Sequence, residues 1–361
     1  MKRPSVAATP ARADTSRFFP TGKGHDMRIE RGTWTVLIGT SLLCWVFPLV
    51  AASTANGQAP NTRISAAKAW AFPQFPPPDP RAPKADPARL IHVAGSTRTY
   101  TQAQLDADHF VPDWFPQDHP AAPPIVTVAR HPGWPWPCAE CHMSNGAGVP
   151  ATAQIMGLPK AYIREQIAAF RQGQRGASPS RTTRDMADEA RSIDDDDLEA
   201  AASYFSRLKF VPHTRVIESA SVPKTHWEYF VLRPDQGGAR EPTGERIVEV
   251  PVSFDDYRHG SDRTRYVAYV PPGSIARGAV IAARGSGGLP ACESCHGAKL
   301  QGTELIPPLA GRSPTCIVRE LLLFRGNQRS NPAAAPMRLQ ASRLTVGDMI
   351  AVAAYAGSRT P

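Results

Sequence analysis

The stretch "WPCAECHMSNGAG" at residues 136–148 decides how the rest of the chain is interpreted. It holds two cysteines three positions apart with a histidine directly after the second, and "PACESCHGAKLQG" at 290–302 repeats this arrangement. A redox disulfide of the thioredoxin type would need a βαβ context, and zinc would need further Cys/His pairs at finger-like distances. C-x-x-C-H is instead typical of covalent haem attachment, in which the cysteines form thioether bonds and the histidine binds the iron. The sequence therefore predicts two covalently bound haems c, one on Cys138, Cys141 and His142 and one on Cys292, Cys295 and His296.

The sequence around the two motifs repeats at an offset of 154 residues. "GLPKAYIREQIAAFRQGQR" (157–175) follows the first motif and "LAGRSPTCIVRELLLFRGNQR" (309–329) follows the second. The apolar residues of each segment recur at helical spacing, which predicts an amphipathic helix. Each half then ends in a further helix, at 194–208 and 345–357. The four aspartates at 194–197 fit the N-terminus of such a helix better than a metal site.

Each half also places one methionine between its two helices, in a segment expected to be a loop. Met186 and Met337 occupy these positions. A thioether is a soft ligand that suits the second axial position of a haem iron. The alternative is that both side chains only fill gaps in the core. The matched positions favour ligation, so the predicted metal ligands are His142, Met186, His296 and Met337.

The N-terminal region contains a long apolar run at 34–52, preceded by arginines and followed by small residues at 51–55. This pattern predicts that residues 1–55 are a signal peptide, with Met27 as a possible true start. The alternative is an uncleaved N-terminal anchor that associates with the membrane through 34–52, since the run is nearly long enough to span.

The remainder divides by composition. Residues 56–90 are rich in proline and alanine and are expected to form an extended tether. Residues 91–212 are expected to form the first haem domain together with an N-terminal extension. Residues 213–285 contain β-branched and aromatic runs broken by glycine and proline, which predict a small β-rich insert or linker. Residues 286–361 are expected to form the second haem domain.

Charge and cysteine content exclude two other classes of protein. The formal net charge of +9 includes no dense basic tract, so nucleic acid is not an expected partner. Four of the six cysteines belong to the two motifs, which leaves little for a disulfide framework. The six are Cys44, Cys138, Cys141, Cys292, Cys295 and Cys316.

With these motifs, the chain resembles the tandem dihaem class I cytochromes c of bacterial periplasms. The resemblance covers about 138–210 and 285–357 and includes both C-x-x-C-H motifs, the helices after them and the two methionines. It implies a mainly α fold of two small class I cytochrome c-like helical haem domains in tandem, with His/Met ligation of both irons. The chain departs from the family in its N-terminal extension, in the β-rich insert and in Cys316, which stands where Tyr162 supplies an aromatic residue.

The resemblance also implies a function and a location. The expected protein is a periplasmic electron carrier, not an enzyme, whose haems cycle between Fe(III) and Fe(II). Electrons would come from a dehydrogenase-type donor and pass to another cytochrome or a terminal oxidase, with the chain either free or a subunit of an oxidoreductase complex. The alternatives are a dihaem cytochrome c peroxidase-type enzyme and a haem-containing sensor or subunit of a larger complex.

Overall fold

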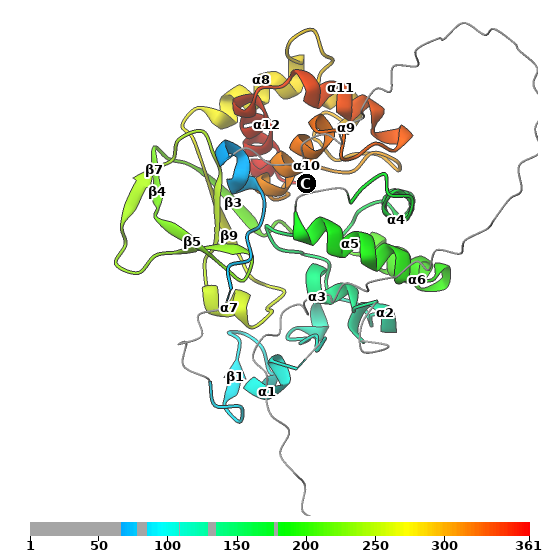
Figure 1. Ribbon diagram of the computed structural model, residues 1–361, viewed down its shortest axis with the longest axis vertical. Helices are drawn as coiled ribbons and strands as arrows, with labels where there is room; N and C mark the ends of the chain where they lie inside the picture. The colour runs from blue at the N-terminus through cyan, green and yellow to red at the C-terminus, as the bar shows by residue number, and fades with distance from the viewer. Residues whose placement is uncertain (1–65, 78–84, 108, 129–134, 177–179) are drawn as a thin grey trace, which may run out of the picture. The chain divides into compact units, whose positions relative to one another are not determined.

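A computed structural model describes residues 66–77, 85–107, 109–128, 135–176 and 180–361 (Figure 1). These residues belong to one compact unit of the chain, Arg63–Pro361. The expected signal peptide or anchor at 1–55, with its apolar run, and the first part of the expected tether lie outside the described residues. Within the described residues, none of the helices has the length and apolar character needed to cross a membrane.

Two groups of helices follow the two halves of the sequence repeat. The first group consists of α2 (Pro124–Thr127), α3 (Cys138–His142), α4 (Lys160–Arg171), α5 (Arg181–Ser192) and α6 (Asp195–Arg207). The second group consists of α8 (Ser274–Arg284), α9 (Glu293–His296), α10 (Pro314–Arg325), α11 (Ala335–Arg343) and α12 (Val346–Ser358), with a 3-10 turn η3 (Pro332–Ala334) before α11.

The last helix of each group begins at the expected cap. The Asp194 carboxylate accepts the Asp197 backbone N–H at 2.7 Å. Thr345 and Asp348 form a reciprocal capping box at the start of α12. Such bonds satisfy backbone N–H groups that have no partner within the helix. The aspartate run therefore acts as a helix N-terminus, as its spacing predicts.

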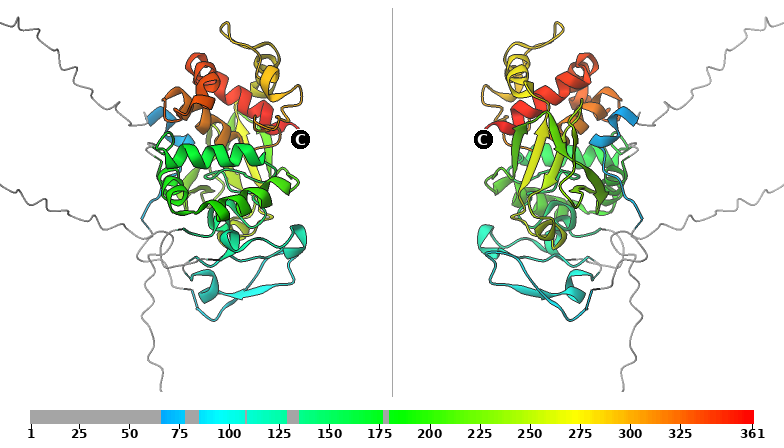
Figure 2. Two further views of the ribbon diagram at one scale, coloured as in Figure 1. Left: turned by 90° about the vertical axis from the view of Figure 1, so that its right-hand side faces the viewer. Right: turned by 90° about the vertical axis from the view of Figure 1, so that its left-hand side faces the viewer.

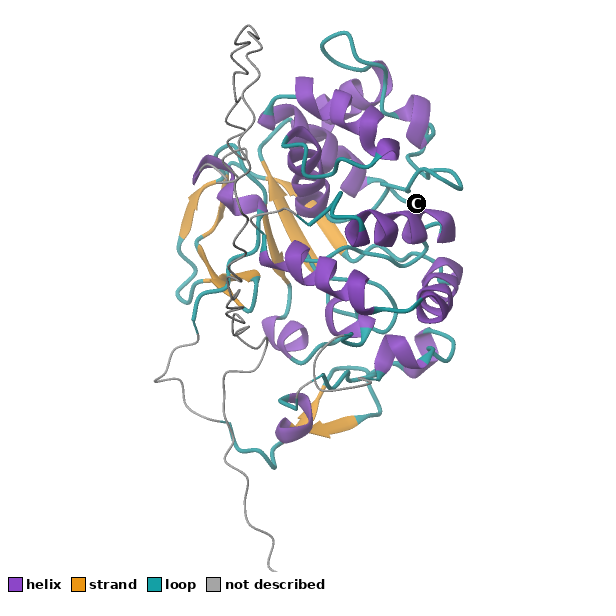
Figure 3. Cartoon of the chain, turned by 45° about the vertical axis from the view of Figure 1, so that its right-hand side comes forward, coloured by secondary structure: helices purple, strands orange, loops and turns teal. Residues whose placement is uncertain are grey.

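Strands occupy most of the segment between the two helical groups, beside the helices (Figure 3). One sheet has the order β3-β9-β8, with β3 parallel and β8 antiparallel to β9. Two further pairs, β4 with β7 and β5 with β6, are antiparallel. The bounds are β3 Thr214–Glu218, β4 Ser221–Pro223, β5 Thr225–Glu228, β6 Val231–Pro234, β7 Arg240–Pro242, β8 Val248–Pro251 and β9 Tyr266–Val270, with a short helix α7 at Phe254–Arg258.

The expected β-rich segment, 213–285, ends in a helix, and that helix packs with the second group. α8 starts directly after Gly273, which has a left-handed backbone conformation with a φ of 80°. The helix crosses α12 at Gly278. A Cβ on Gly278 would lie 2.0 Å from the Ala351 carbonyl oxygen, so only glycine permits this approach. Residues 274–285 are thus part of the second helical group in space.

The sheet and the second helical group share one hydrophobic core. Ala268 and Val270 of β9 and Ile247, directly before β8, are buried in the same cluster as the inner faces of α10, α11 and α12. The 3-10 helix η1 (Ala66–Ala71) adds Ala71 and Phe72 to this cluster from the N-terminal side. A continuous core of this kind fixes the insert against the second group.

The extension before the first motif forms a small lobe at the edge of the structure (Figure 2). It contains β1 (Leu90–His92), β2 (Thr99–Thr101), α1 (Gln102–Leu105) and a 3-10 turn η2 (Pro116–Asp118). Trp114 and Phe115 are fully buried here, and the Trp114 indole N–H donates to the His259 carbonyl oxygen at 2.8 Å. The extension is therefore packed against the insert.

Candidate functional site

Each C-x-x-C-H motif lies on one turn of helix, α3 in the first half and α9 in the second. In both halves the residue after the histidine leaves the helix with a positive φ, 64° at Met143 and 82° at Gly297. The Gly148 backbone N–H then returns to the His142 carbonyl oxygen at 3.0 Å, and the Gly302 N–H returns to the His296 carbonyl oxygen at 2.8 Å. These equivalent bonds, 154 residues apart, show that the sequence repeat is also a repeat of backbone geometry.

Both motif histidines are held by the same hydrogen bond. His142 Nδ1 lies 2.8 Å from the Ala153 carbonyl oxygen, and His296 Nδ1 lies 3.0 Å from the Pro307 carbonyl oxygen. A carbonyl only accepts, so Nδ1 donates and Nε2 is left as the basic nitrogen that can bind a metal. Burial lowers the pKa of both histidines, which favours the neutral ligand form.

The motif cysteines are free thiols. The five cysteines in the described part of the chain form no disulfide. Burial raises the pKa of Cys138 to about 12 and also raises the pKa of Cys141 well above its ordinary value. The described residues also contain no group of three or more His, Cys, Asp or Glu side chains that could hold a metal ion. Two free thiols without such a group of ligands fit thioether attachment of a haem better than a zinc site.

The two methionines lie in helices, not in the loops that the sequence predicted. Met186 belongs to α5 and Met337 to α11. Each is partly buried and packs on the core of its own helical group, Met186 against the cluster that includes Ile167 and Phe170. Met186 is helical because "RTTRDMADEARS" contains no glycine or proline, and Pro336 precedes Met337 in the first turn of α11, where proline is tolerated.

A buried polar cluster joins the two helical groups. Arg175 donates to Gln166 at 2.8 Å and pairs with Glu320 of the other half at 3.2 Å. Arg329 pairs with Glu320 at 2.6 Å and donates to Gln166 of the other half at 2.7 Å. Arg175 and Arg329 are equivalent in the repeat, as are Gln166 and Glu320, so the cluster has approximate two-fold symmetry. The pairs Gln174-Arg175 and Gln328-Arg329 were visible as part of the repeat, but the sequence did not reveal these contacts.

Buried arginines in this region outnumber buried carboxylates. Arg312 donates to the Met156 carbonyl oxygen at 3.0 Å, and Arg319 donates to the Pro150 carbonyl oxygen at 2.8 Å. The Nε atoms of Arg175 and Arg329 are buried and have no hydrogen-bond partner. Unpaired buried N–H groups and unbalanced buried charge are costly. The region therefore fits a cofactor that brings carboxylates of its own, as haem does through its two propionates.

Sequence reasoning also missed a buried carboxyl group beside the first motif. Glu189 in α5 accepts the Trp136 backbone N–H at 2.8 Å. Burial raises the pKa of this carboxyl group to about 8. Nothing in the polar sequence of α5 distinguishes this glutamate from its exposed neighbours.

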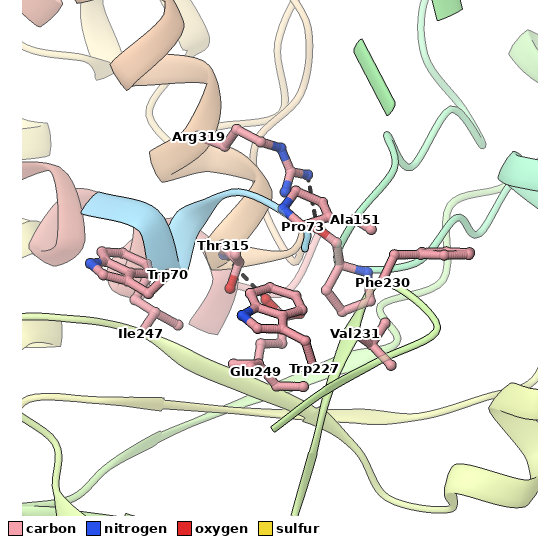
Figure 4. A pocket seen from close by; sticks show the side chains of 12 residues that line it. Trp70, Pro73, Ala151, Trp227, Phe230, Val231, Ile247, Glu249, Thr315 and Arg319 are labelled. Atoms are coloured by element: carbon pink, nitrogen blue, oxygen red, sulfur yellow. Dashed lines mark hydrogen bonds between the residues drawn. The ribbon is translucent and has the colours of Figure 1, made fainter. Parts of the chain in front are cut away.

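A pocket between the insert and the second group does not involve the motifs (Figure 4). Trp70 and Trp227 lie across it, and the Glu249 carboxylate accepts the Thr315 backbone N–H at 3.2 Å. Arg319 closes one side through its bond to Pro150. The lining residues are Trp70, Pro73, Pro150, Ala151, Trp227, Phe230, Val231, Leu232, Ile247, Glu249, Thr315 and Arg319.

Comparisons with known proteins agree with the geometry of the first motif. Residues 137–209 match the family model of cytochrome c. A thiosulfate dehydrogenase electron acceptor from Thiomonas intermedia is 25% identical over 223 residues, which are 60% of this chain and 76% of that protein.

Solved structures give weaker similarities. A thiosulfate dehydrogenase (TsdBA) from Marichromatium purpuratum is 26% identical with a TM-score of 0.43, and the match covers 62% of this chain but only 37% of that one. Cytochrome c4 from Acidithiobacillus ferrooxidans is 22% identical with a TM-score of 0.40, and the match covers 61% of this chain and 98% of that one.

These findings indicate a cytochrome c domain at residues 137–209. They support a cytochrome c family for this chain, with covalently bound haem c, electron transfer through haem and redox proteins as partners.

The prediction that the protein is an electron carrier and not an enzyme is wrong. The Thiomonas relative is the electron acceptor of a thiosulfate dehydrogenase, so it points to a function tied to an enzyme.

Proposed function

We propose that the protein is the dihaem electron-accepting subunit of an oxidoreductase that oxidises a small inorganic sulfur compound. The name of the Thiomonas relative supports the choice of thiosulfate as the first substrate to test. One haem would be held by Cys138, Cys141 and His142 and the other by Cys292, Cys295 and His296. When bound, each haem supplies one-electron chemistry between Fe(III) and Fe(II).

The observation that carries the proposal is the repeated histidine bond. In each half the carbonyl oxygen eleven residues after the histidine accepts its Nδ1–H, although Ala153 stands in one half and Pro307 in the other. A second motif without a haem would not need this orientation of its imidazole, because the bond serves to direct Nε2 toward a ligand.

The remaining parts of the proposal follow the same repeat. Met186 and Met337 are the sixth ligands, since each is the matched, partly buried thioether of its half. The second cytochrome domain begins at α8, near Ser274 and not at residue 286, because α8 packs along α12. Export to the periplasm, where covalent haem attachment takes place, accompanies this function, with electrons leaving for another cytochrome or a terminal oxidase.

The haem count is tested on the full chain produced in a host that attaches haem c. After acid–acetone extraction, a pyridine haemochrome assay should find two haems on each polypeptide. Cys138→Ser should weaken attachment of one haem, and Cys295→Ser should do so for the other. One haem per chain, or haem that extracts freely, contradicts the tandem arrangement.

Ligation and enzyme partnership need separate measurements. The ferric protein should show the weak Met–Fe(III) charge-transfer band, and Met186→Ala and Met337→Ala should each remove about half of it. Thiosulfate together with a purified thiosulfate dehydrogenase should reduce the haems, whereas thiosulfate alone should not. Absence of reduction in both mixtures contradicts the enzyme assignment while leaving the haem count untouched.

A further inference from the structure

Three residues at the first motif and in the insert have backbone conformations that their side chains disfavour. Among the described residues, six non-glycine residues have a positive φ, and three of them are Met143, Tyr229 and Phe230, with φ of 64°, 45° and 59°. A positive φ brings the Cβ atom of such a residue too close to the neighbouring backbone, which lowers stability. Conformations of this kind persist only where the surrounding structure imposes them, and they concentrate at functional sites.

Tyr229 and Phe230 form the two-residue loop between β5 and β6, because Glu228 pairs with Val231 across the hairpin. A hairpin loop of two residues that both have positive φ is the type for which Asn-Gly is strongly preferred. Two aromatic residues stand here instead. The requirements of the turn therefore do not explain the sequence at its tip.

Met143 shows the same conflict within the repeat. It directly follows His142, and the residue that directly follows His296 is Gly297, with a φ of 82°. Glycine adopts positive φ without a steric penalty, because it has no Cβ atom. The first half thus keeps a methionine where the second half has the residue that the backbone favours.

The three strained side chains belong to one hydrophobic cluster. This cluster also contains Val149 and Ala151, from the chain that follows the first motif, and Tyr257 of α7. Phe230 and Ala151 line the same pocket, as Figure 4 shows. The tip of the hairpin and the residue after the motif histidine are therefore parts of the same apolar contact.

Helix α7 fixes the tip of the hairpin beside the motif. The Tyr257 hydroxyl group donates to the Tyr229 carbonyl oxygen, and Arg258 Cζ lies 3.9 Å from the centre of the Tyr229 ring. Burial raises the pKa of Tyr257 well above its ordinary value, and Cys141 of the first motif is close enough to raise it further. The strained tip is thus held in place from the side of the insert and lies close to the site of haem attachment.

The chain after the first motif is shielded from water, whereas its counterpart is not. Residues 144 to 150 are all buried, and the equivalent residues 298 to 304 are exposed or partly exposed except Leu300. The hairpin belongs to the segment between the two halves, so the repeat contains no second copy of it. Ferric iron carries one more positive charge than ferrous iron, and water stabilises that charge. Dry surroundings therefore favour Fe(II) and raise the reduction potential of a haem.

We propose that Met143, Tyr229 and Phe230, the strained clamp, are positioning residues of the first haem site that raise the reduction potential of the first haem. The clamp holds the chain that follows His142 and keeps water away from it. The stability lost to three positive φ values is retained as the condition for these contacts. The inference rests on the proposed function, because it needs a haem at the first motif.

The test uses the haem-loaded full chain in a spectroelectrochemical titration that resolves its two one-electron steps. Tyr229→Asn with Phe230→Gly gives the turn its preferred residues and removes both rings. Met143→Gly gives the first half the residue that the second half has at this position. It decides the question on its own if the hairpin variant does not fold.

Two control variants separate the clamp from general effects on the insert. Tyr229→Phe with Phe230→Tyr keeps both aromatic rings and should preserve both potentials. Val222→Ala removes part of a fully buried side chain from a different cluster of the insert, so it lowers stability without touching the clamp. A chain with Cys292→Ala and Cys295→Ala, which cannot attach the second haem, identifies the step that belongs to the first haem.

In both clamp variants the ratio of reduced to oxidised first haem at a fixed applied potential should fall at least about tenfold, equivalent to about 59 mV for one electron. The second haem, and both haems in the control variants, should change less than about twofold. An unchanged first haem, an equal fall in both haems, or an equal fall in Val222→Ala overturns the proposal. Haem content is measured on every variant. Unchanged potentials with two haems present leave the proposed function standing, whereas a single haem on the wild-type chain contradicts that function itself.

Discussion

Glu320 is expected to hold the two helical groups together. Gln166, the equivalent residue in the other half, provides an internal control. Glu320 pairs with Arg175 at 3.2 Å and with Arg329 at 2.6 Å, and its side chain is 26% exposed. Glu320→Gln removes the one carboxylate that, among the described residues, pairs with both guanidinium groups. Removing one partner from a buried ion pair costs about 3–5 kcal/mol, and partial exposure reduces this to about 2–4 kcal/mol.

The assay is guanidinium chloride unfolding of the haem-loaded protein at neutral pH, followed by circular dichroism and by the Soret band. Gln166→Glu is the matched control, because it places a carboxylate between the same two arginines from the other half. This variant should change the free energy of unfolding by less than about 1 kcal/mol. Glu320→Gln with unchanged stability, or an equal loss in Gln166→Glu, would refute the reasoning.

The same carboxylate predicts an acid dependence. Burial alone would raise the pKa of Glu320, but the Arg175 and Arg329 guanidinium groups outweigh burial and hold the pKa below its ordinary value. A lowered folded pKa contributes stability above the ordinary glutamate pKa, and this contribution is lost as pH falls through the folded value. The difference in stability between wild type and Glu320→Gln should therefore shrink below about pH 4.

Three further changes test other parts of the fold by thermal and denaturant unfolding. Gly278→Ala should lower the free energy of unfolding by about 3 kcal/mol or more, because the new Cβ would lie 2.0 Å from a backbone oxygen of α12. Gly326→Ala is the control and should lower it much less, because its Cβ would meet nothing closer than 3.3 Å. Asp194→Ala should cost about 1 kcal/mol through loss of the N-cap bond to α6, and Asp194→Ser should recover most of it; no loss in the alanine variant contradicts the capping role. Burial raises the pKa of the Glu189 carboxyl group to about 8 in the folded state, so the stability of the wild type should fall as pH rises from the ordinary glutamate range through about pH 8. Glu189→Gln should abolish this fall. An unaltered pH profile in the variant would exclude Glu189 as its source.

The sequence determined those features that depend on a few neighbouring residues. The C-x-x-C-H motifs each lie on one helical turn, as their spacing requires. The caps at Asp194 and Thr345 were also visible, since a capping bond joins residues three apart. The offset of 154 predicted which residues correspond, and the matching backbone bonds at His142 and His296 follow that register.

Other features could not be predicted because they depend on packing between distant segments. Local sequence did not separate α8 from the β-rich segment, since its assignment to the second group rests on the contact of Gly278 with Ala351. It placed Met186 and Met337 in loops, although helix α5 and helix α11 contain them.

The difference between the two motifs was decided by tertiary structure alone. As sequences, "CAECH" and "CESCH" are equivalent, because attachment chemistry resides within five residues. The first motif and the buried loop at 144–150 after it are contacted by His109, Tyr229 and Asp262, which lie 31 to over 100 residues away in the chain. Exposure is a property of everything that packs around a residue, so the same repeat has a buried loop at 144–150 and a mostly exposed loop at 298–304.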